Sequence, residues 1–429
     1  MRGYWTGLAV AAVMVVSGCG LGGADPQGDA APAAPAAAAT GEVKGTVTLQ
    51  TWALKPKFTT YMERVIGAFE KKYPGTKVEW LDQPPDAYSE KVLNQAASGT
   101  LPDVTNLPPD FARPLVKQEM LLDVAQADPR LAEEYVAGGL DAYRFRGFSG
   151  TYGYPWYLNT DVNYWNSELM KKNGLDPAKP PTTFDELVEQ ARTFKEKSGG
   201  KVYLMSRRPE LGDLTQAGVK IMSDDGRSFV FNTPEAAAVI DKYRAAYKEG
   251  LLPRDVLTDT YAGNAKLFNE GTVAWTTAGA NHIIAVKTDN PSLAPKVVPS
   301  PAMGVPPLYV QGLSISKRTK NPAAAVALAR WVTSPENQAA FAHEVSVFPS
   351  TKASANDPFF TRSDGTNGGD AKVIAFKSLA TAKVLQPVEV TEAMSKFVRQ
   401  QIALALTGEV SSKEALDAAV AKCNELLNQ

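Results

Sequence analysis

Cysteine and histidine are almost absent from this chain of 429 residues, which contains two of each. Two cysteines cannot form a disulfide framework. Two histidines nearly exclude a multi-histidine metal site, so we expect neither a metal nor a cofactor. Cys423 lies at helical spacing from Leu416, Val420 and Leu427. This pattern predicts a small buried apolar side chain rather than a reactive thiol.

An excess of charge of either sign is also missing. Lys and Arg total 45 and Asp and Glu total 46, which gives a formal net charge of −1. A nucleic-acid partner would need a basic face, so none is expected. The hydrophobic share of 44% and the charged share of 21% are ordinary for a globular protein. The length accommodates two domains.

The N-terminus predicts export. Arg2 precedes an apolar run over residues 8–16, which is too short to span a membrane. The following Val-Ser-Gly-Cys resembles the lipobox of bacterial lipoproteins, so residues 1–19 are interpreted as a signal peptide whose Cys19 is acylated. Acyl chains would anchor the protein to the outer face of the bacterial cell membrane. A plain signal peptide with an incidental cysteine is the alternative.

Residues 20–45 are rich in Ala, Pro and Gly and contain too few large apolar residues to pack a core, which predicts a disordered tether. Strands and helices then alternate. Buried strands are predicted at 47–52, 76–80 and from 102, and helices at 58–72 and 88–97. This order indicates an α/β lobe with a largely parallel sheet. Capping boxes at Thr183 and Ser411 mark the starts of two later helices.

Six segments, in order, carry a resemblance to a known family. They are 69–78 (FEKKYPGTKV), 97–104 (ASGTLPDV), 153–157 (GYPWY) with 164–170 (YWNSELM), 267–275 (LFNEGTVAW), 310–316 (VQGLSIS) and 398–408. The chain resembles the extracellular solute-binding proteins of ATP-powered carbohydrate importers, the group that includes maltose-binding protein. The resemblance extends from about residue 47 to the C-terminus, so it covers nearly all of the chain after the tether.

The resemblance implies an α/β, two-lobed, periplasmic-binding-protein-like fold of the class II type, with a hinge of two or three crossing strands. The first lobe would comprise residues 46–155 plus 301–342, and the second 156–300 plus 343–429. A sugar or oligosaccharide would bind between the lobes and be delivered to an ABC permease and its ATPase. The implied protein is a monomer and a receptor rather than an enzyme.

Sugar hydroxyls favour planar polar side chains, and sugar C–H faces favour aromatic rings. The first candidates follow strand ends, where α/β sheets present ligands: Trp52, Asn106 and Asp110. The resemblance places Asp110 at a sugar-binding Asp of the maltose-binding group. A core tryptophan is the alternative for Trp52, and helix capping is the alternative for Asp110.

The crossing between the lobes supplies Trp156, Tyr157 and Asn159. Because side chains alternate along a strand, at least one of the two aromatic rings is expected to face the cleft. Asn159 stands where the maltose-binding group carries a sugar-binding Glu, which points to a different hydroxyl pattern. Trp156→Ala or Asn159→Ala is therefore expected to lower ligand affinity without unfolding the protein.

The resemblance adds four ligand-binding candidates. Asn281 replaces a stacking Trp of the maltose-binding group, which weakens a specific maltodextrin assignment. Gln311 and Gly312 lie on a segment that returns to the cleft, where glycine allows close approach to the backbone. Arg399 matches a ligand-side Arg, although a solvated position on a helix surface is the favoured interpretation for it.

The sequence alone leaves other functions open. The same fold could bind a glycerophosphodiester, a polyamine or a peptide. A phosphate ester would favour arginines or helix N-termini, for which Arg207 and Arg208 are candidates. A polyamine would need several carboxylates in the cleft. A secreted carbohydrate-active enzyme with paired carboxylates is the remaining class, although no catalytic set stands out.

Overall fold

The computed structural model describes residues 41–258, 261–345 and 347–428. The predicted signal peptide, Cys19 and most of the predicted tether lie outside these residues. Within the described residues, no helix is both long enough and apolar enough to cross a membrane.

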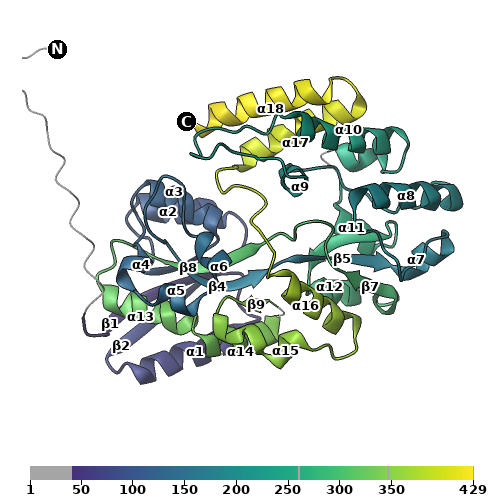
Figure 1. The fold of residues 1–429 in the computed structure, drawn as a ribbon. Coiled ribbons are helices and arrows are strands. Elements are labelled where there is room, and N and C mark those ends of the chain that lie inside the picture. Colours follow the sequence, from purple (N-terminus) through teal and green to yellow (C-terminus); the bar gives the residue numbers. More distant parts are fainter. Residues whose placement is uncertain (1–40, 259–260, 346, 429) are drawn as a thin grey trace, which may run out of the picture. The chain divides into compact units, whose positions relative to one another are not determined.

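A mixed sheet of six strands forms the centre of the first lobe, in the order β2-β1-β3-β8-β4-β9 (Figure 1). β1 pairs in parallel with β2 and β3, whereas the β3–β8, β8–β4 and β4–β9 pairs are antiparallel. The prediction of a largely parallel sheet is therefore wrong, because β8 returns from the other lobe in the opposite direction. The strands are β1 (Gly45–Trp52), β2 (Thr76–Gln83), β3 (Val104–Leu107), β4 (Tyr154–Asn159), β8 (Tyr309–Ile315) and β9 (Phe348–Pro349).

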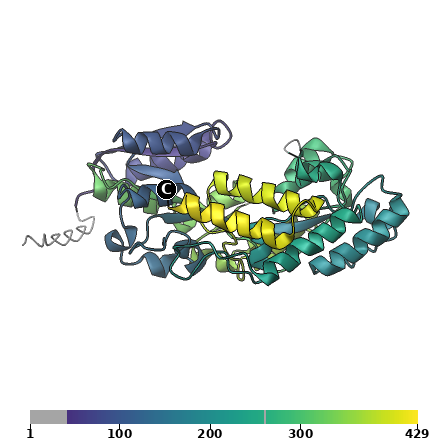
Figure 2. The same ribbon diagram turned by 90° about the horizontal axis from the view of Figure 1, so that it is seen from above.

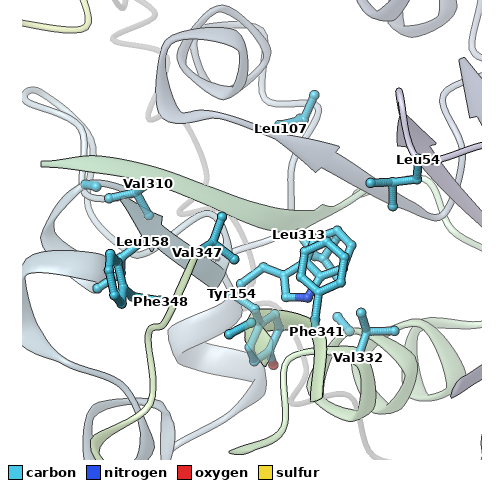
Figure 3. Packing of buried hydrophobic residues seen from close by; sticks show 14 of the residues in the cluster. Leu54, Leu107, Tyr154, Leu158, Val310, Leu313, Val332, Phe341, Val347 and Phe348 are labelled. Atoms are coloured by element: carbon cyan, nitrogen blue, oxygen red, sulfur yellow. The ribbon is translucent and has the colours of Figure 1, made fainter. Parts of the chain in front are cut away.

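Helices cover this sheet, with the largest apolar side chains between sheet and helices. Figure 3 shows Leu313 and Tyr154 of the sheet with Val332 and Phe341 of two covering helices. The helices are α1 (Thr59–Lys72), α2 (Tyr88–Ala97), α3 (Pro109–Lys117), α4 (Val124–Ala127), α5 (Leu131–Glu134), α6 (Ala137–Asp141), α13 (Pro322–Val332) and α14 (Pro335–Val345).

The second lobe is built on a three-stranded sheet in the order β6-β5-β7. The strands are β5 (Asp161–Asn166), β6 (Trp275–Gly279) and β7 (Val297–Ser300). Helices α17 and α18 run side by side and cover this lobe together with α10 (Figure 2). The helices are α7 (Ser167–Lys172), α8 (Phe184–Ser198), α9 (Leu211–Gln216), α10 (Pro234–Lys248), α11 (Asn264–Asn269), α12 (His282–Asp289), α15 (Pro358–Thr361), α16 (Asn367–Ser378), α17 (Glu392–Thr407) and α18 (Ser412–Leu427), with 3₁₀ turns at Arg254–Leu257 and Ala294–Lys296. A third 3₁₀ turn, Lys352–Asn356, contacts α5 and α14 of the first lobe.

The chain crosses between the sheets at short connections. Thr160 alone separates β4 of one sheet from β5 of the other and is fully buried. Residues 301–308 lead back from β7 to β8. The predicted first lobe ends at residue 342. Residues 348 and 349 nevertheless form β9, which pairs with β4 of this lobe. We retain the predicted lobe division as a proposal, with β9 added to the first lobe.

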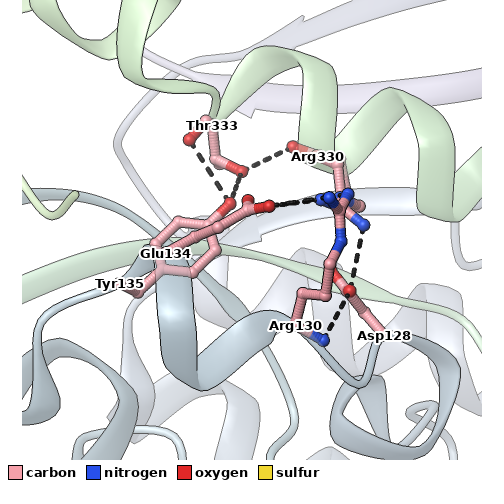
Figure 4. A network of polar contacts seen from close by, with 7 residues as sticks. Asp128, Arg130, Glu134, Tyr135, Arg330 and Thr333 are labelled. Atoms are coloured by element: carbon pink, nitrogen blue, oxygen red, sulfur yellow. Dashed lines mark hydrogen bonds and ion pairs between the residues drawn. The ribbon is translucent and has the colours of Figure 1, made fainter. Parts of the chain in front are cut away.

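A network of polar contacts fixes α13 on the first lobe (Figure 4). The Arg330 guanidinium lies 2.9 Å from the carboxylate of Asp128 and 2.6 Å from that of Glu134. The Tyr135 hydroxyl lies 2.7 Å from the hydroxyl of Thr333. Asp128 is only 2% exposed, so its charge depends on this partner.

Several elements and helix caps predicted from short sequence patterns are present in the structure. The predicted early strands and helices form β1 to β3, α1 and α2. Thr183 caps α8, although the Glu186 carboxylate accepts from the amide of Thr182 instead of that of Thr183. Ser411 and Glu414 form the complete capping box of α18. Cys423 is fully buried, and burial raises the pKa of its thiol to about 11, which confirms the apolar interpretation.

Trp156 lies in the core, and this burial predicts a large effect of its removal. Its ring stacks on Phe341 at 5.1 Å between ring centroids, and no part of it is exposed. Trp156→Ala is therefore expected to lower the free energy of unfolding by about 3–5 kcal/mol, because the substitution leaves a cavity. Urea denaturation measures the change. The control Ile284→Ala, at a side chain 53% exposed, should change it by less than about 0.5 kcal/mol. Equal effects of the two substitutions would contradict the prediction.

Candidate functional site

A cavity of about 1360 Å³ lies between the two lobes. The first lobe contributes the start of β8, the first turn of α3 and the segment after α6. The second lobe contributes β5, β6, α9 and the residues before and after α9. A connection within the second lobe, residues 382–390, also lines the cavity. Both charged and aromatic side chains therefore face a space large enough for a small solute.

Asp161 and Tyr309 connect the two lobes inside this cavity. Asp161 is the first residue of β5 and Tyr309 the first of β8, and the Tyr309 hydroxyl donates to the Asp161 carboxylate at 3.2 Å. Burial raises the pKa of Asp161, while the Tyr309 hydroxyl and the charge of Arg207 act in the opposite direction. Tyr309 is 52% exposed, so its ring is available from the cavity. The pair therefore presents a partly desolvated carboxylate beside an aromatic surface.

Asp110 supplies a second carboxylate from the first turn of α3. Burial raises its pKa, and hydrogen bonds from its own amide and from the amide of Phe111 act against this rise. The N-cap residue of α3 is Pro108, with no capping hydrogen bond from a side chain, so Asp110 is a first-turn residue that lines the cavity rather than the helix cap.

The wall from the second lobe combines an ion pair with aromatic rings. Arg207 pairs with Asp213 of α9, whose carboxylate also accepts from the amide of Glu210 at 2.8 Å. Trp275 of β6 lines the cavity, although it is only 3% exposed. Its indole N–H donates to Asn163 at 2.9 Å. This wall therefore offers polar edges beside an aromatic surface, and much of its hydrogen-bonding capacity is already used.

Of the ten predicted ligand-binding residues, Asp110 and Gln311 line the cavity. Asn106 lies behind Gln311, because its amide donates to the Gln311 side chain at 3.2 Å and to the carbonyl of Gly312 at 3.0 Å. Gly312 allows a close approach within the protein itself, since a Cβ there would lie 2.7 Å from the carbonyl of Tyr154. The structure thus brings Asn106, Gln311 and Gly312 together.

The predicted aromatic residues lie outside the lining of this cavity. Trp52 stacks on Tyr88 with 5.0 Å between the ring centroids and 9° between the ring planes. Trp156 is in the core, and the half-buried Tyr157 contacts both Trp156 and Phe341. The expectation that Trp156 or Tyr157 faces the ligand remains a prediction, but neither ring lines the cavity.

Asn159 and Asn281 come together at Gly279, where an added Cβ would lie 2.7 Å from the amide nitrogen of Asn159 and 3.3 Å from Asn281. Arg399 lies on α17 and pairs with Glu392 at 2.6 Å. None of these three predicted residues lines the cavity, and their proposed contacts with ligand remain untested.

A family model described as bacterial extracellular solute-binding protein matches residues 52–339, which is more than half of the chain. The chain belongs to this family. The family and its relatives below are solute-binding proteins rather than enzymes. The match agrees with the resemblance seen in the sequence and removes the alternative of a secreted carbohydrate-active enzyme.

Solved structures share the two-lobed fold. A structure from Synechococcus sp. MITs9220, assigned as an oligosaccharide periplasmic-binding protein, is 27% identical with a TM-score of 0.78, covering 89% of this chain and 99% of that one. The cyclic alpha-maltosyl-1,6-maltose binding protein of Arthrobacter globiformis is 21% identical with a TM-score of 0.74, covering 90% and 99%. At this lower identity the likeness shows the fold alone.

Relatives found by sequence cover a smaller share of the chain. A protein of Brucella abortus assigned as a binding protein is 25% identical over 285 residues, which is 61% of this chain and 64% of the relative. The sn-glycerol-3-phosphate-binding periplasmic protein of Escherichia coli is 23% identical over 300 residues, 64% of this chain and 67% of the relative. The chain thus matches only about two thirds of the length of these relatives.

Most of the residues that line the cavity were not among the predicted ligand-binding residues, and Asp161, Tyr309 and Arg207 are examples. Asp161 and Tyr309 each lie two positions from a predicted residue, Asn159 and Gln311. The two-residue repeat of side chains along β8 was therefore an available signal for Tyr309, whereas Asp161 lies on another strand than Asn159. The sequence suggests Arg207 only as a phosphate-binding candidate, whereas the carboxylate of Asp213 neutralises it in the structure.

The raised pKa of Asp161 predicts a pH-dependent stability. A carboxyl whose pKa is higher in the folded than in the unfolded state favours folding while protonated, below its ordinary pKa of about 3.9. This benefit is lost as the pH rises through the folded-state pKa. Asp161→Asn, which stays neutral, is therefore expected to be more stable than the wild type at pH 7, with a smaller difference at pH 4. Urea denaturation at both values measures it.

The control for this experiment is Asp364→Asn. The hydroxyl and amide of Thr366 lower the pKa of Asp364, so its ionised form favours folding at pH 7. The control should therefore lower stability at pH 7, which is the opposite sign. A wild type more stable than Asp161→Asn at pH 7 would contradict the prediction.

Proposed function

We propose that this protein binds a sugar or oligosaccharide in the cavity between its lobes and delivers it to the permease of an ABC importer. The observation that carries the proposal is the Asp161–Tyr309 contact, which joins the lobes inside a cavity that also presents Asp110, Gln311 and Trp275. Family membership supports the capture of a solute, and the chemistry of these side chains supports a polyhydroxylated one.

The side chains match what a sugar needs. The carboxylate oxygens of Asp161 and Asp110 accept hydrogen bonds from hydroxyl groups, and the Gln311 amide both accepts and donates. The exposed ring of Tyr309 offers a flat surface for C–H groups. Because the surrounding walls restrict water, each hydrogen bond to a ligand would be stronger than in bulk solvent.

A solute touching both lobes would favour the arrangement in which they approach each other, which is a shift in population. Direct contacts across the cavity support this mechanism. The guanidinium of Arg146 donates to the carbonyl of Ser223 at 3.1 Å, and the amide of Gln216 donates to the carbonyl of Val305 at 3.0 Å. The permease would then recognise the ligand-bound arrangement.

The charges at the cavity distinguish a sugar from a phosphate ester as the ligand. The Escherichia coli relative is named as a binding protein for such an ester, sn-glycerol-3-phosphate. Basic side chains at the cavity largely have acidic partners: Arg144 with Asp141, Arg207 with Asp213, Lys220 with Asp224 and Lys242 with Asp185. Arg146 and Lys383 have no ion-pair partner among the described residues. Among the residues that the structure describes, the cavity carboxylates of Asp110, Asp161 and Glu210 also have no ion-pair partner. The lining thus contains six basic and six acidic side chains and has no surplus of positive charge to attract an anion.

The proposal includes a lipid anchor that holds the protein at the membrane. Cys19 would carry the lipid and hold a monomeric receptor at the outer face of the bacterial membrane, with the Ala- and Pro-rich tether between anchor and fold. Cys19→Ala is expected to move the protein from the membrane fraction to the soluble fraction in cells that process lipoproteins. Immunoblots of the two fractions measure this, and an unchanged distribution would contradict the anchor.

A ligand screen tests the binding function. Neutral oligosaccharides, among them maltotriose, should raise the melting temperature of the purified protein, whereas glycerol-3-phosphate and putrescine should not. Binding to the folded state alone raises stability in proportion to the logarithm of ligand excess. If no saccharide binds while glycerol-3-phosphate does, the phosphate-ester alternative replaces the proposal.

Two substitutions test the site with the best saccharide of that screen. Asp161→Asn removes a charged acceptor and Tyr309→Phe removes the hydroxyl that orients it. Each is expected to weaken affinity about tenfold or more, because a hydrogen bond to a charged group contributes about 1.5–3 kcal/mol. Calorimetry measures the affinity, and Asp364→Asn, outside the cavity, should leave it unchanged. Wild-type affinity in both cavity variants would place the ligand elsewhere.

A further inference from the structure

The connection between α16 and α17 forms a wall of the cavity. We call residues 382–390 the strap, and all nine of them line the cavity. The strap begins and ends in the second lobe, because α16 packs on β5 and β7, and α17 packs on α10 and α18. In Figure 1 it runs as the unlabelled connection from α16 up to α17. A segment without helix or strand structure thus makes a large part of the binding surface.

Both lobes hold the first half of the strap. The amide of Leu308, from the first lobe, donates to the carbonyl of Lys383 at 2.8 Å, and the amide of Lys383 donates to the carbonyl of Pro306 at 3.0 Å. From the second lobe, the hydroxyl of Thr215 donates to the carbonyl of Leu385 at 2.7 Å. Hydrogen bonds to the strap backbone therefore fix this half between the start of β8 and α9.

An ion pair with the first lobe holds the other half. The Nε atom of Arg113, on α3, lies 3.2 Å from a carboxylate oxygen of Glu389, and the two side chains are 21% and 4% exposed. Glu389 has no other ion-pair partner among the described residues. A buried carboxylate without a cation is strongly unfavourable, so Glu389 depends on Arg113 to stay in this position.

The position of Arg113 relates the pair to the ligand. Asp110 and Arg113 are three residues apart on the same helix, so their side chains lie on neighbouring positions of one face. Asp110 lines the cavity, and Glu389 is part of the wall of the same cavity. The ion pair therefore sets the distance between a ligand-facing carboxylate of the first lobe and the strap of the second.

We propose that Arg113 and Glu389 are positioning residues whose ion pair holds the strap against the first lobe and so completes the binding cavity. The effect on affinity rests on the function proposed above, whereas the effect on the strap does not. Without the pair, the remaining charge would move toward water and the strap would leave its place at the cavity wall.

The variant Glu389→Gln tests this with two measurements. In the ligand-free protein, amide hydrogen exchange over residues 385–390 should accelerate at least tenfold relative to the wild type, while the α1 and α18 amides keep their rates. In calorimetry, affinity for maltotriose should fall by about tenfold or more, as expected when one partner of a buried ion pair is removed. Unchanged exchange over 385–390 would overturn the proposal.

Asp128→Asn is the matched control, because it breaks an ion pair of similar burial outside the cavity. Asp128 and its partner Arg330 are 2% and 25% exposed. Both variants should lower the melting temperature, but only Glu389→Gln should change strap exchange and maltotriose affinity. If the two variants differ in neither measurement, Arg113 and Glu389 have a structural role alone and the proposal fails.

The double variant Arg113→Gln with Glu389→Gln provides a rescue. Two amides can hydrogen-bond without leaving a buried charge, so strap exchange and affinity should return to within about threefold of the wild type. A double variant as impaired as Glu389→Gln would contradict the assignment to this pair. If the wild type binds neither maltotriose nor any other saccharide, the proposed function fails, and strap exchange alone then decides the role of the ion pair.

Discussion

The pairing of β8 between β3 and β4 is the constraint on which the site depends. β8 forms after the chain has passed through the second lobe, and its hydrogen bonds to both neighbours fix segments that are distant in sequence. Asn106 and Gln311, for example, are separated by 205 positions and share a hydrogen bond. Leu313 and Ile315 of the same strand are fully buried in the core. Core packing therefore places Tyr309 and Gln311 at the cavity with little freedom, which is the preorganisation that selective binding requires.

The cavity keeps charges that folding alone would not favour. Burial raises the pKa values of Asp110 and Asp161, so each carboxylate is less stable there than in water. Elsewhere the buried acids have closer partners, as Asp128 has Arg330. Local departures of this kind are expected where a ligand supplies the missing hydrogen bonds. Under the proposed function, the cavity gives up some stability of the ligand-free protein in exchange for affinity.

Local signals predicted the first lobe's early elements and several caps, because strand composition, helical spacing and capping act over a few residues. The order of the six-stranded sheet could not follow from such signals, since β8 and β9 join it from remote parts of the chain. Trp156 shows the same limit. Four of the six residues of β4 are buried, and only Tyr157 and Asn159 are partly accessible. Where most of a strand is buried on both faces, the alternation of side chains cannot identify the face that meets a ligand. The contact between Asp161 and Tyr309 could not be predicted without knowing which two strand starts meet.

The contacts between the lobes differ in what they cost to break. The hydrogen bonds from Arg146 to Ser223 and from Gln216 to Val305 are neutral at the acceptor, so water can replace them when the lobes separate. Separating Arg113 from Glu389 would leave a carboxylate that is 4% exposed without a cation. Opening of the cavity should therefore proceed by rotation that preserves the strap and its ion pair, while the contacts of Arg146 and Gln216 open.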